Sequence, residues 1–210
     1  MGNKTNRTSN ITNGMDNESQ QFKLEFGFNI VLLGESDVGK TCLFRKYTTG
    51  KFKENFNQKW GYHYFFKQLK VKDKDVELFI GVIGGQKRYR RLVPRITQDA
   101  HGILLLYDTA NIRTFEKLRE WREIMRDLAP EAIIFIIGAR SDLFHRREVL
   151  FEEGQNFAKS ENLEFFECSA KTGENVKEIF EQMTLRILEK EELISFIHPF
   201  EIEIEGKSPE

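Results

Sequence analysis

The chain has 210 residues, of which 31% are charged and 40% are hydrophobic, and its formal net charge at pH 7 is −1. This length suits one domain with extensions, and the balanced charge argues against a nucleic-acid partner. Two cysteines, Cys42 and Cys168, give no disulfide framework. Without a secretory signal or a long apolar run, the chain is predicted to be cytoplasmic with reduced thiols.

The first segment with a chemical signature follows a polar start. Residues 1–22 are rich in Asn, Ser and Thr, which predicts a flexible extension. The apolar run Phe28–Leu33 then predicts a strand, and a helix is expected to begin at Thr41. Between them stands the sequence Gly-Glu-Ser-Asp-Val-Gly-Lys-Thr, a G-x-x-x-x-G-K-T loop in the strand–loop–helix context of a phosphate site.

The residue types of this loop fit phosphate chemistry. Gly34 and Gly39 permit a backbone that turns successive N–H groups inward, at a helix N-terminus that favours an anion. Lys40 reaches the terminal phosphates, and the Thr41 hydroxyl is a ligand for Mg²⁺. The alternative interpretation, a glycine turn beside a surface lysine, does not explain the flanking strand and helix.

The rest of the chain predicts alternating strands and helices. Further strands are expected at Trp60–Val71, Val76–Val82, Gly102–Tyr107, Ala132–Ile137 and Leu163–Cys168, the first two joined as a hairpin by a turn at Lys72–Asp75. Helices are expected at Phe115–Leu128, Glu148–Ser160 and from Val176 onward. These elements predict an α/β domain with a mostly parallel six-stranded sheet covered by helices on both faces.

The order and spacing of the motifs resemble the Ras superfamily of small GTPases, and within it the Rab branch. The matching stretches are Gly34–Thr41, Gly84–Tyr89, Ile103–Asp108, Ser141–Leu143 and Cys168–Gly173. The resemblance implies a P-loop small G domain at residues 23–190, between the extensions 1–22 and 191–210. It implies GTP or GDP at Glu35, Ser36, Asp37, Val38, Gly39, Lys40, Thr41, Cys42, Phe52, Lys59, Gly85, Arg140, Asp142, Ser169, Ala170 and Lys171.

The base-recognition motif departs from the family pattern Asn-Lys-x-Asp. Here the stretch is Ala139-Arg140-Ser141-Asp142. Asp142 keeps the carboxylate that accepts two hydrogen bonds from guanine, and Arg140 can cover the ring where the family has lysine. Ala139 lacks the amide, and losing one such bond costs about 0.5–1.5 kcal/mol. The resemblance thus implies guanine binding that is weakened but retained. For Phe52, packing on the base and ordinary loop packing both stay open.

The metal-binding positions depart further. The family holds Mg²⁺ with the loop threonine, a switch threonine, and the aspartate of D-x-x-G; here these positions carry Thr41, Lys59 and Val82. The resemblance therefore implies weakly held Mg²⁺. Lys59 has two interpretations: its ammonium replaces part of the metal's charge, or it is a solvated loop lysine.

The predicted activity follows from these departures. Gly85 keeps the N–H for a γ-phosphate, and Gln86 stands at the position that orients the attacking water. We expect an atypical Rab-like GTPase with slow hydrolysis, acting in membrane-traffic or signalling regulation. The alternative is a pseudo-GTPase scaffold with little or no turnover. A third hypothesis, an adenine-specific ATPase or kinase, is disfavoured by Asp142.

Two surface segments and the chain end complete the predictions. The aromatic run Trp60–Phe66 forms either an effector surface or a partly buried hairpin face, and the basic run Lys87–Arg95 is expected to be a solvated, mobile switch loop. No cysteine follows Cys168, so we expect either a protein without C-terminal prenyl groups or a fragment of a longer chain, and any contact with endomembranes is expected to be peripheral. Apolar and acidic residues alternate over Phe200–Glu205, which predicts a short docked or linking strand.

Overall fold

A six-stranded sheet forms the centre of the protein. The computed structural model describes residues 26–53 and 61–197, with side chains through residue 193. The strands are β1 (Phe26–Gly34), β2 (Tyr62–Val71), β3 (Lys74–Ile83), β4 (Gly102–Asp108), β5 (Ile133–Ala139) and β6 (Glu164–Cys168). Their order is β2-β3-β1-β4-β5-β6. β2 pairs with β3 in antiparallel fashion and the other neighbours are parallel, so the predicted fold class is confirmed.

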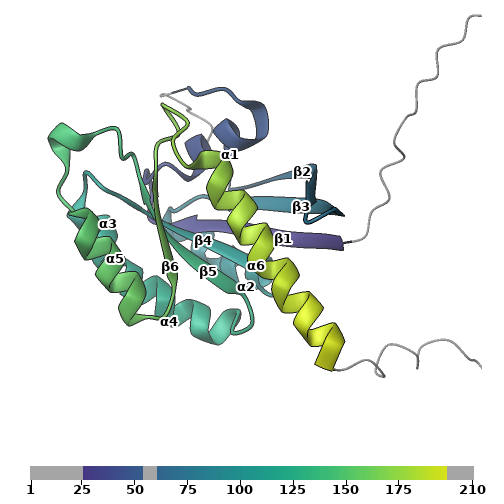
Figure 1. Ribbon diagram of the computed structural model, residues 1–210. Helices are drawn as coiled ribbons and strands as arrows, with labels where there is room; N and C mark the ends of the chain where they lie inside the picture. Colours follow the sequence, from purple (N-terminus) through teal and green to yellow (C-terminus); the bar gives the residue numbers. More distant parts are fainter. Residues whose placement is uncertain (1–25, 54–60, 198–210) are drawn as a thin grey trace, which may run out of the picture.

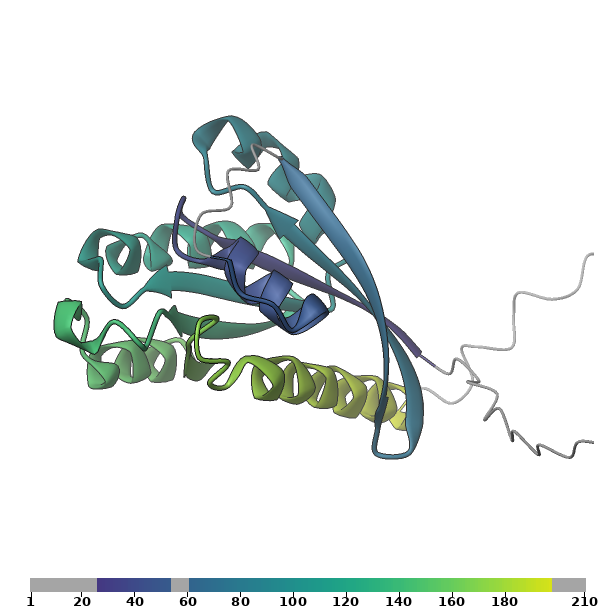
Figure 2. The ribbon, with the colours of Figure 1, turned by 90° about the horizontal axis from the view of Figure 1, so that it is seen from above.

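Helices cover both faces of this sheet (Figures 1 and 2). They are α1 (Lys40–Thr49), α2 (Val93–Thr97), α3 (Ile112–Glu116), α4 (Leu118–Leu128), α5 (Phe151–Ser160) and α6 (Val176–Ile197), with short 3₁₀ helices η1 (Lys87–Leu92) and η2 (Phe144–Arg146). One core cluster joins the sheet to α1 and α6. The second joins it to α2, α3, α4 and α5. The sheet is therefore buried from both sides.

Hydrophobic patterning explains most of these elements. Every residue of β4 is buried, as expected for a central parallel strand. Leu118, Trp121 and Met125 form the buried stripe of α4. The helix predicted from Phe115 to Leu128 is instead two helices that meet at Lys117. The Asn111 side chain caps the first of them by accepting from the Arg113 N–H.

Two turn predictions need correction. The hairpin between β2 and β3 turns at Lys72 and Asp73 alone, both with positive φ (47° and 64°). Such a two-residue turn matches the twist of the strands, so the predicted turn through Asp75 was too long. The predicted loop in the basic run is also wrong, because this segment forms η1 and α2, with Pro94 at the start of α2.

The last helix extends beyond the predicted end of the domain. α6 continues to Ile197, so the domain boundary predicted after Lys190 falls inside a helix. The predictions for residues 1–22 and for Phe200–Glu205 lie outside the described residues. Among the helices of the described ranges, none is both long and apolar enough to cross a bilayer.

The topology determines where a ligand site forms. β1, β3, β4, β5 and β6 run parallel, so their carboxyl ends meet at one edge of the sheet. The loops that follow them carry nearly all of the predicted site residues. In open α/β sheets this edge is the place where ligands bind.

Candidate functional site

The phosphate loop (residues 34–41) connects β1 to α1 in a curled backbone. Gly34 has φ +132°, and a Cβ there would lie 2.3 Å from the Leu106 carbonyl oxygen, so only glycine fits. Gly39 has φ +99° and is the N-cap of α1. Asp37 also adopts positive φ, at 65°. Alternating backbone conformations of this kind direct N–H groups toward a common point at the helix N-terminus, where an anion is favoured.

Lys40 is buried at the base of this loop with 5% of its surface exposed. Its Nζ donates to the carbonyl oxygens of Gly34 at 2.9 Å and Glu35 at 2.5 Å. Burial lowers its pKa to about 8, although the nearby carboxylates of Glu35 and Asp37 act in the opposite direction. A buried ammonium with neutral carbonyl partners is destabilised until an anion approaches, which suits a phosphate.

A cavity of about 250 Å³ opens beside the phosphate loop. It gathers seven of the predicted nucleotide-binding residues: Gly39, Cys42, Phe52, Arg140, Asp142, Ala170 and Lys171. It is also lined by Leu43, Ala139, Leu143, Arg146 and Cys168, which the sequence had not placed in the binding set. The apolar members gave no distinct signal, since a buried leucine in a helix is ordinary core in sequence terms. The cavity has the size and mixed lining expected around a purine base.

Asp142 is held in this cavity by Ser169. The Ser169 hydroxyl is fully buried and donates to Asp142 Oδ1 at 2.6 Å. The Ser169 Oγ in turn accepts from the N–H groups of Lys171 (3.2 Å) and Thr172 (3.1 Å). The loops after β5 and β6 are thereby joined. This arrangement orients the carboxylate that the motif assigned to base recognition.

Arg140 has a partner that the sequence did not reveal. Its Nη1 lies 2.6 Å from Oδ2 of Asp108, whose side chain is 7% exposed at the end of β4. Asp108 Oδ1 also accepts from the Ala110 N–H at 2.9 Å. Arg140 itself has positive φ (66°), and the Thr109 hydroxyl donates to its carbonyl oxygen at 3.1 Å. The pair holds Arg140 along the cavity wall, although Asp108 itself does not line the cavity.

Two positions that carry polar ligand groups in the family carry buried apolar side chains here. Ala139 is buried, and its Cβ lies 3.7 Å from the place where a Cβ on Gly39 would stand. Val82 is 2% exposed and belongs to the core beneath α1. Within residues 26–53 and 61–197 no three His, Cys, Asp or Glu side chains group as metal ligands. The donors present therefore fit a nucleotide, but for Mg²⁺ they offer the half-buried Thr41 and no carboxylate at position 82.

Gly85 and Gln86 lie at the phosphate side of the loop. A Cβ on Gly85 would be 2.3 Å from both the carbonyl carbon of Glu35 and the backbone nitrogen of Ser36, so the two backbones are in close contact. Gln86 is exposed and precedes η1. Lys59 lies outside the described residues. Gly85 is thus in contact with the phosphate loop, and Gln86 follows it directly in the chain.

The carboxylate of Glu35 has a role that sequence reasoning missed. It accepts from Arg90 Nη2 at 2.7 Å and from Trp121 Nε1 at 3.0 Å. Arg90 also pairs with Glu120 on α4. The predicted solvated loop is therefore wrong for Arg90, which is half-buried and ion-paired. Its partners are 30 and 55 residues away in sequence, so no local pattern pointed to them.

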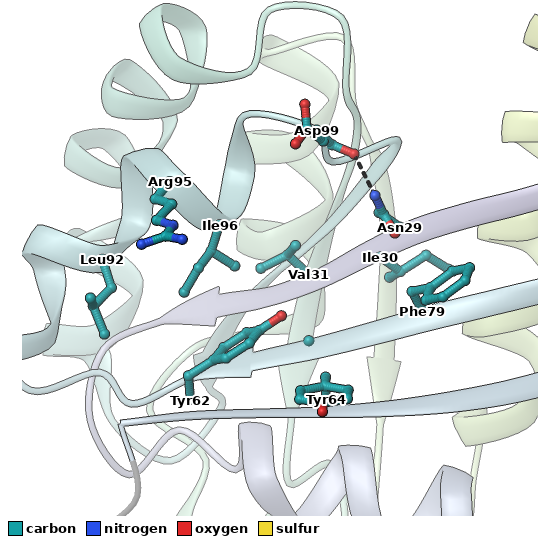
Figure 3. A pocket seen from close by; sticks show the side chains of 11 residues that line it. Asn29, Ile30, Val31, Tyr62, Tyr64, Phe79, Leu92, Arg95, Ile96 and Asp99 are labelled. Carbon is teal, nitrogen blue, oxygen red and sulfur yellow. Dashed lines mark hydrogen bonds between the residues drawn. The ribbon is translucent and has the colours of Figure 1, made fainter.

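A second cavity, of about 520 Å³, lies between the start of β2 and α2 (Figure 3). Tyr62 and Tyr64 form its floor on the sheet, and Leu92, Arg95 and Ile96 lie across from them. Tyr64 is 64% exposed and Phe66 is 48% exposed. Both rings are therefore partly buried and still expose aromatic surface, so the effector surface and the partly buried hairpin face both stay open. The cavity belongs to the outer surface of the domain, away from the phosphate loop.

The fold and the site define the class of protein. A mostly parallel sheet with a G-x-x-x-x-G-K-T loop after its first strand, a buried loop lysine, and a cavity at the strand ends is a P-loop nucleotide-binding domain.

Comparison with known proteins specifies the family. Residues 29–189 match the model of the Ras family. The Ras-related protein RABA6b of Arabidopsis thaliana is 34% identical over 176 residues, covering 83% of this chain and 77% of the relative. The human Ras-related protein Rab-4A is 37% identical over 167 residues, covering 79% and 77%. The chain belongs to the Ras family and is a Rab-like small GTPase, a class that binds GTP or GDP with Mg²⁺ and works through effectors and regulators.

Proposed function

We propose that this protein binds GTP and GDP mainly through its phosphate loop, hydrolyses GTP slowly, and acts as a cytoplasmic regulator of membrane traffic or signalling. Its base recognition rests on Asp142, Arg140 and Ala170 without the usual asparagine. Its Mg²⁺ is held by Thr41, phosphate oxygens and water. Any contact with endomembranes is peripheral.

One observation carries this proposal. The buried, desolvated Lys40 stands in a complete loop, whereas Val82, at the family's metal-side aspartate, is packed in the core. A phosphate placed on the loop gains charge-assisted hydrogen bonds from Lys40. Position 82 provides no ligand for the metal, because the isopropyl side chain of valine has no oxygen. Affinity is thus retained while metal-dependent chemistry is reduced.

The same residues define how hydrolysis would proceed. Mg²⁺, when bound, neutralises charge on the phosphates. Lys40 stabilises the charge that develops on the transferred group, the Gly85 N–H contacts its oxygen, and Gln86 orients the attacking water. With fewer groups holding the metal, the reaction is expected to be no faster than that of an ordinary small GTPase. A single-turnover assay of wild type against Gln86→Leu tests this: a fast rate that does not depend on Gln86 contradicts the assignment.

The nucleotide itself can be identified directly. Protein purified under native conditions is denatured, and the released nucleotide is separated by chromatography. Guanine nucleotide, in GDP or GTP form, is the expected result. Adenine nucleotide would favour an ATPase or kinase, and no nucleotide at any added concentration would favour the scaffold hypothesis.

Removal of Mg²⁺ tests the weakened metal site. In EDTA we expect the affinity for GDP to fall by no more than about tenfold, because Thr41 is the one expected ligand among the described side chains. Lys59→Ala is measured in parallel, since its ammonium is the candidate substitute charge. A large loss in EDTA together with a silent Lys59→Ala variant would show that the metal is held normally and that Lys59 has no such role.

The scaffold hypothesis has one observation of its own. Contacts within the chain, made by Arg90 and Gly85, hold the segment that moves with the nucleotide in other members of the family. Beside this segment, Tyr62, Tyr64 and Phe66 expose aromatic surface of the kind that partners cover. A protein that displays this surface without turnover is consistent with those contacts. Undetectable hydrolysis combined with partner binding that is the same with GDP and with a GTP analogue would establish it.

A further inference from the structure

Four side chains behind the phosphate loop form one connected polar group, the Arg90 cluster (Glu35, Arg90, Glu120 and Trp121). Arg90 Nη2 lies 2.7 Å from Glu35 Oε1, and its Nη1 pairs with Glu120. Trp121 Nε1 donates to the same Glu35 oxygen at 3.0 Å. The guanidinium carbon lies 5.1 Å from the centre of the Trp121 ring. The cluster thus joins the phosphate loop, η1 and α4.

The environment of the cluster makes these contacts stronger than ordinary surface ion pairs. The side chains of Arg90 and Glu35 are 28% and 25% exposed, so water screens them only in part. One guanidinium serves two carboxylates and lies near an indole face, an arrangement that suits arginine and not lysine. Glu120 is held from its other side by Lys117 at 2.9 Å. Each member therefore restricts the others.

Backbone contacts hold the same segment at two further places. Gly85 is in close contact with the backbone of Glu35 and Ser36, as described above. The Gly84 N–H donates to the Gly61 carbonyl oxygen at 3.0 Å. A Cβ on Gly61 would lie 2.7 Å from the Tyr89 ring, so this ring rests on the Gly61 backbone. Contacts within the protein thus hold residues 84–92 at Gly84, Gly85, Tyr89 and Arg90.

One of the contacts that link this segment to the nucleotide in the family is missing from this chain. In the family the segment responds to the γ-phosphate partly through the D-x-x-G aspartate, and here that position is the buried Val82. We propose that Arg90, through Glu35 and Glu120, is a positioning residue that holds residues 84–92 on the phosphate loop in the same place whether GDP or GTP is bound. The comparison of nucleotide states rests on the proposed function; the positioning by Arg90 does not.

The proposed positioning by Arg90 also affects one wall of the second cavity. Leu92 follows Arg90 by two residues and faces Tyr62 across that cavity, with Ile96 one turn further (Figure 3). Because Arg90 fixes η1, it also fixes this wall. The aromatic surface of β2 is then presented in one shape at all times.

Amide hydrogen exchange of the full chain, read by mass spectrometry over residues 84–97, tests the proposal. Wild type is compared with GDP and with a non-hydrolysable GTP analogue, and we expect exchange rates equal within about threefold. Arg90→Ala is expected to raise the rates at least about tenfold in both states, since hydrogen bonds to charged groups are lost. Arg90→Lys keeps the positive charge but cannot pair with two carboxylates in the way a guanidinium does. Its exchange rates, and those of Glu35→Gln, should lie between those of wild type and Arg90→Ala. Arg91→Ala, at the exposed neighbour, is the matched control and should match wild type.

Trp121 provides a second readout that does not require exchange data. In a Trp60→Phe background it is the remaining tryptophan, and its indole contacts both Glu35 and Arg90. Its emission should be the same with GDP and with the analogue, and should shift in Arg90→Ala. Circular dichroism and the melting temperature show whether Arg90→Ala folds. If it does not, Arg90→Lys is compared with wild type in its place.

The two proposals fail in different ways. If no nucleotide binds, the proposed function is wrong, and wild type against Arg90→Ala still tests the positioning role in nucleotide-free protein. If nucleotide binds and exchange over residues 84–97 differs between the two states by more than about tenfold in wild type, the nucleotide controls the segment and the inference is overturned. Equal exchange in wild type and Arg90→Ala overturns it as well.

Discussion

The two ends of the nucleotide site each contain an arginine bound to a carboxylate, and the two pairs have different consequences. At the base end, Arg140 is paired with Asp108 but remains 41% exposed and lines the cavity. At the switch end, Arg90 is 28% exposed and turned toward Glu35 and α4. The base end therefore keeps a surface that a ligand must complete. At the switch end the Arg90 guanidinium is already paired within the protein, so we expect a change of nucleotide to alter it less.

The largest expected effect comes from removing the buried lysine of the phosphate loop. Lys40→Met should lower the affinity for GDP by at least about 100-fold, because two or more charge-assisted bonds to phosphate are lost at roughly 1.5–3 kcal/mol each. Isothermal titration or fluorescent-nucleotide binding measures the loss. Lys46→Met, at a half-buried lysine of the same helix, is the control and should bind like wild type. Equal affinities for Lys40→Met and wild type would remove the phosphate loop from the proposed function.

Asp142→Asn is expected to break the base end alone. The preference for GDP over ADP should fall about 10- to 100-fold, since a hydrogen bond to a charged group is worth roughly 1.5–3 kcal/mol. Hydrogen exchange over residues 84–97 should stay as in wild type, because the Arg90 cluster does not contact Asp142. Asp127→Asn, an exposed carboxylate of α4, controls for the loss of one charge. A change in exchange at the switch end would show that the two ends are coupled, contrary to the comparison.

The pH dependence of binding should reveal the buried lysine. In the free protein the pKa of Lys40 is lowered to about 8, and a bound phosphate raises it again. Below pH 8 the ammonium is already present; above it, binding must also take up a proton. The affinity for GDP should therefore fall about tenfold between pH 7 and pH 9. Lys40→Arg, which stays charged throughout, should give a flat profile. A flat profile in wild type would contradict the lowered pKa.

The smallest expected effect restores a missing group at the base end. Ala139→Asn should raise the affinity for GDP by up to about tenfold, since one hydrogen bond contributes roughly 0.5–1.5 kcal/mol. Ala139 lines the cavity, so the amide has room to enter it. Ala139→Val adds bulk without an amide and should give no gain. If both variants bind equally, the missing asparagine is not what limits affinity.

The sequence by itself determined the class of fold and the phosphate loop. Buried parallel strands have continuous apolar runs and amphipathic helices have a regular stripe, so β4 and α4 were visible from spacing. Gly34 and Lys40 lie within eight residues of each other, and their roles depend on local backbone geometry that a short motif encodes. The departures from the family motifs at Ala139 and Val82 could also be recognised from the sequence, because each is one residue at a fixed position in a motif.

Only the tertiary structure decided which side chains pair across the site. Arg90 with Glu35, Arg140 with Asp108, and Ser169 with Asp142 are separated by 55, 32 and 27 residues, and no periodicity relates them. The basic run looked like solvated charge because lysine and arginine are most often exposed. Folding brings two carboxylates and an indole to Arg90, and that juxtaposition turns an expected loop into a fixed element. Whether such a residue is free or held depends on neighbours that are distant in sequence, and those neighbours exist only once the sheet has formed.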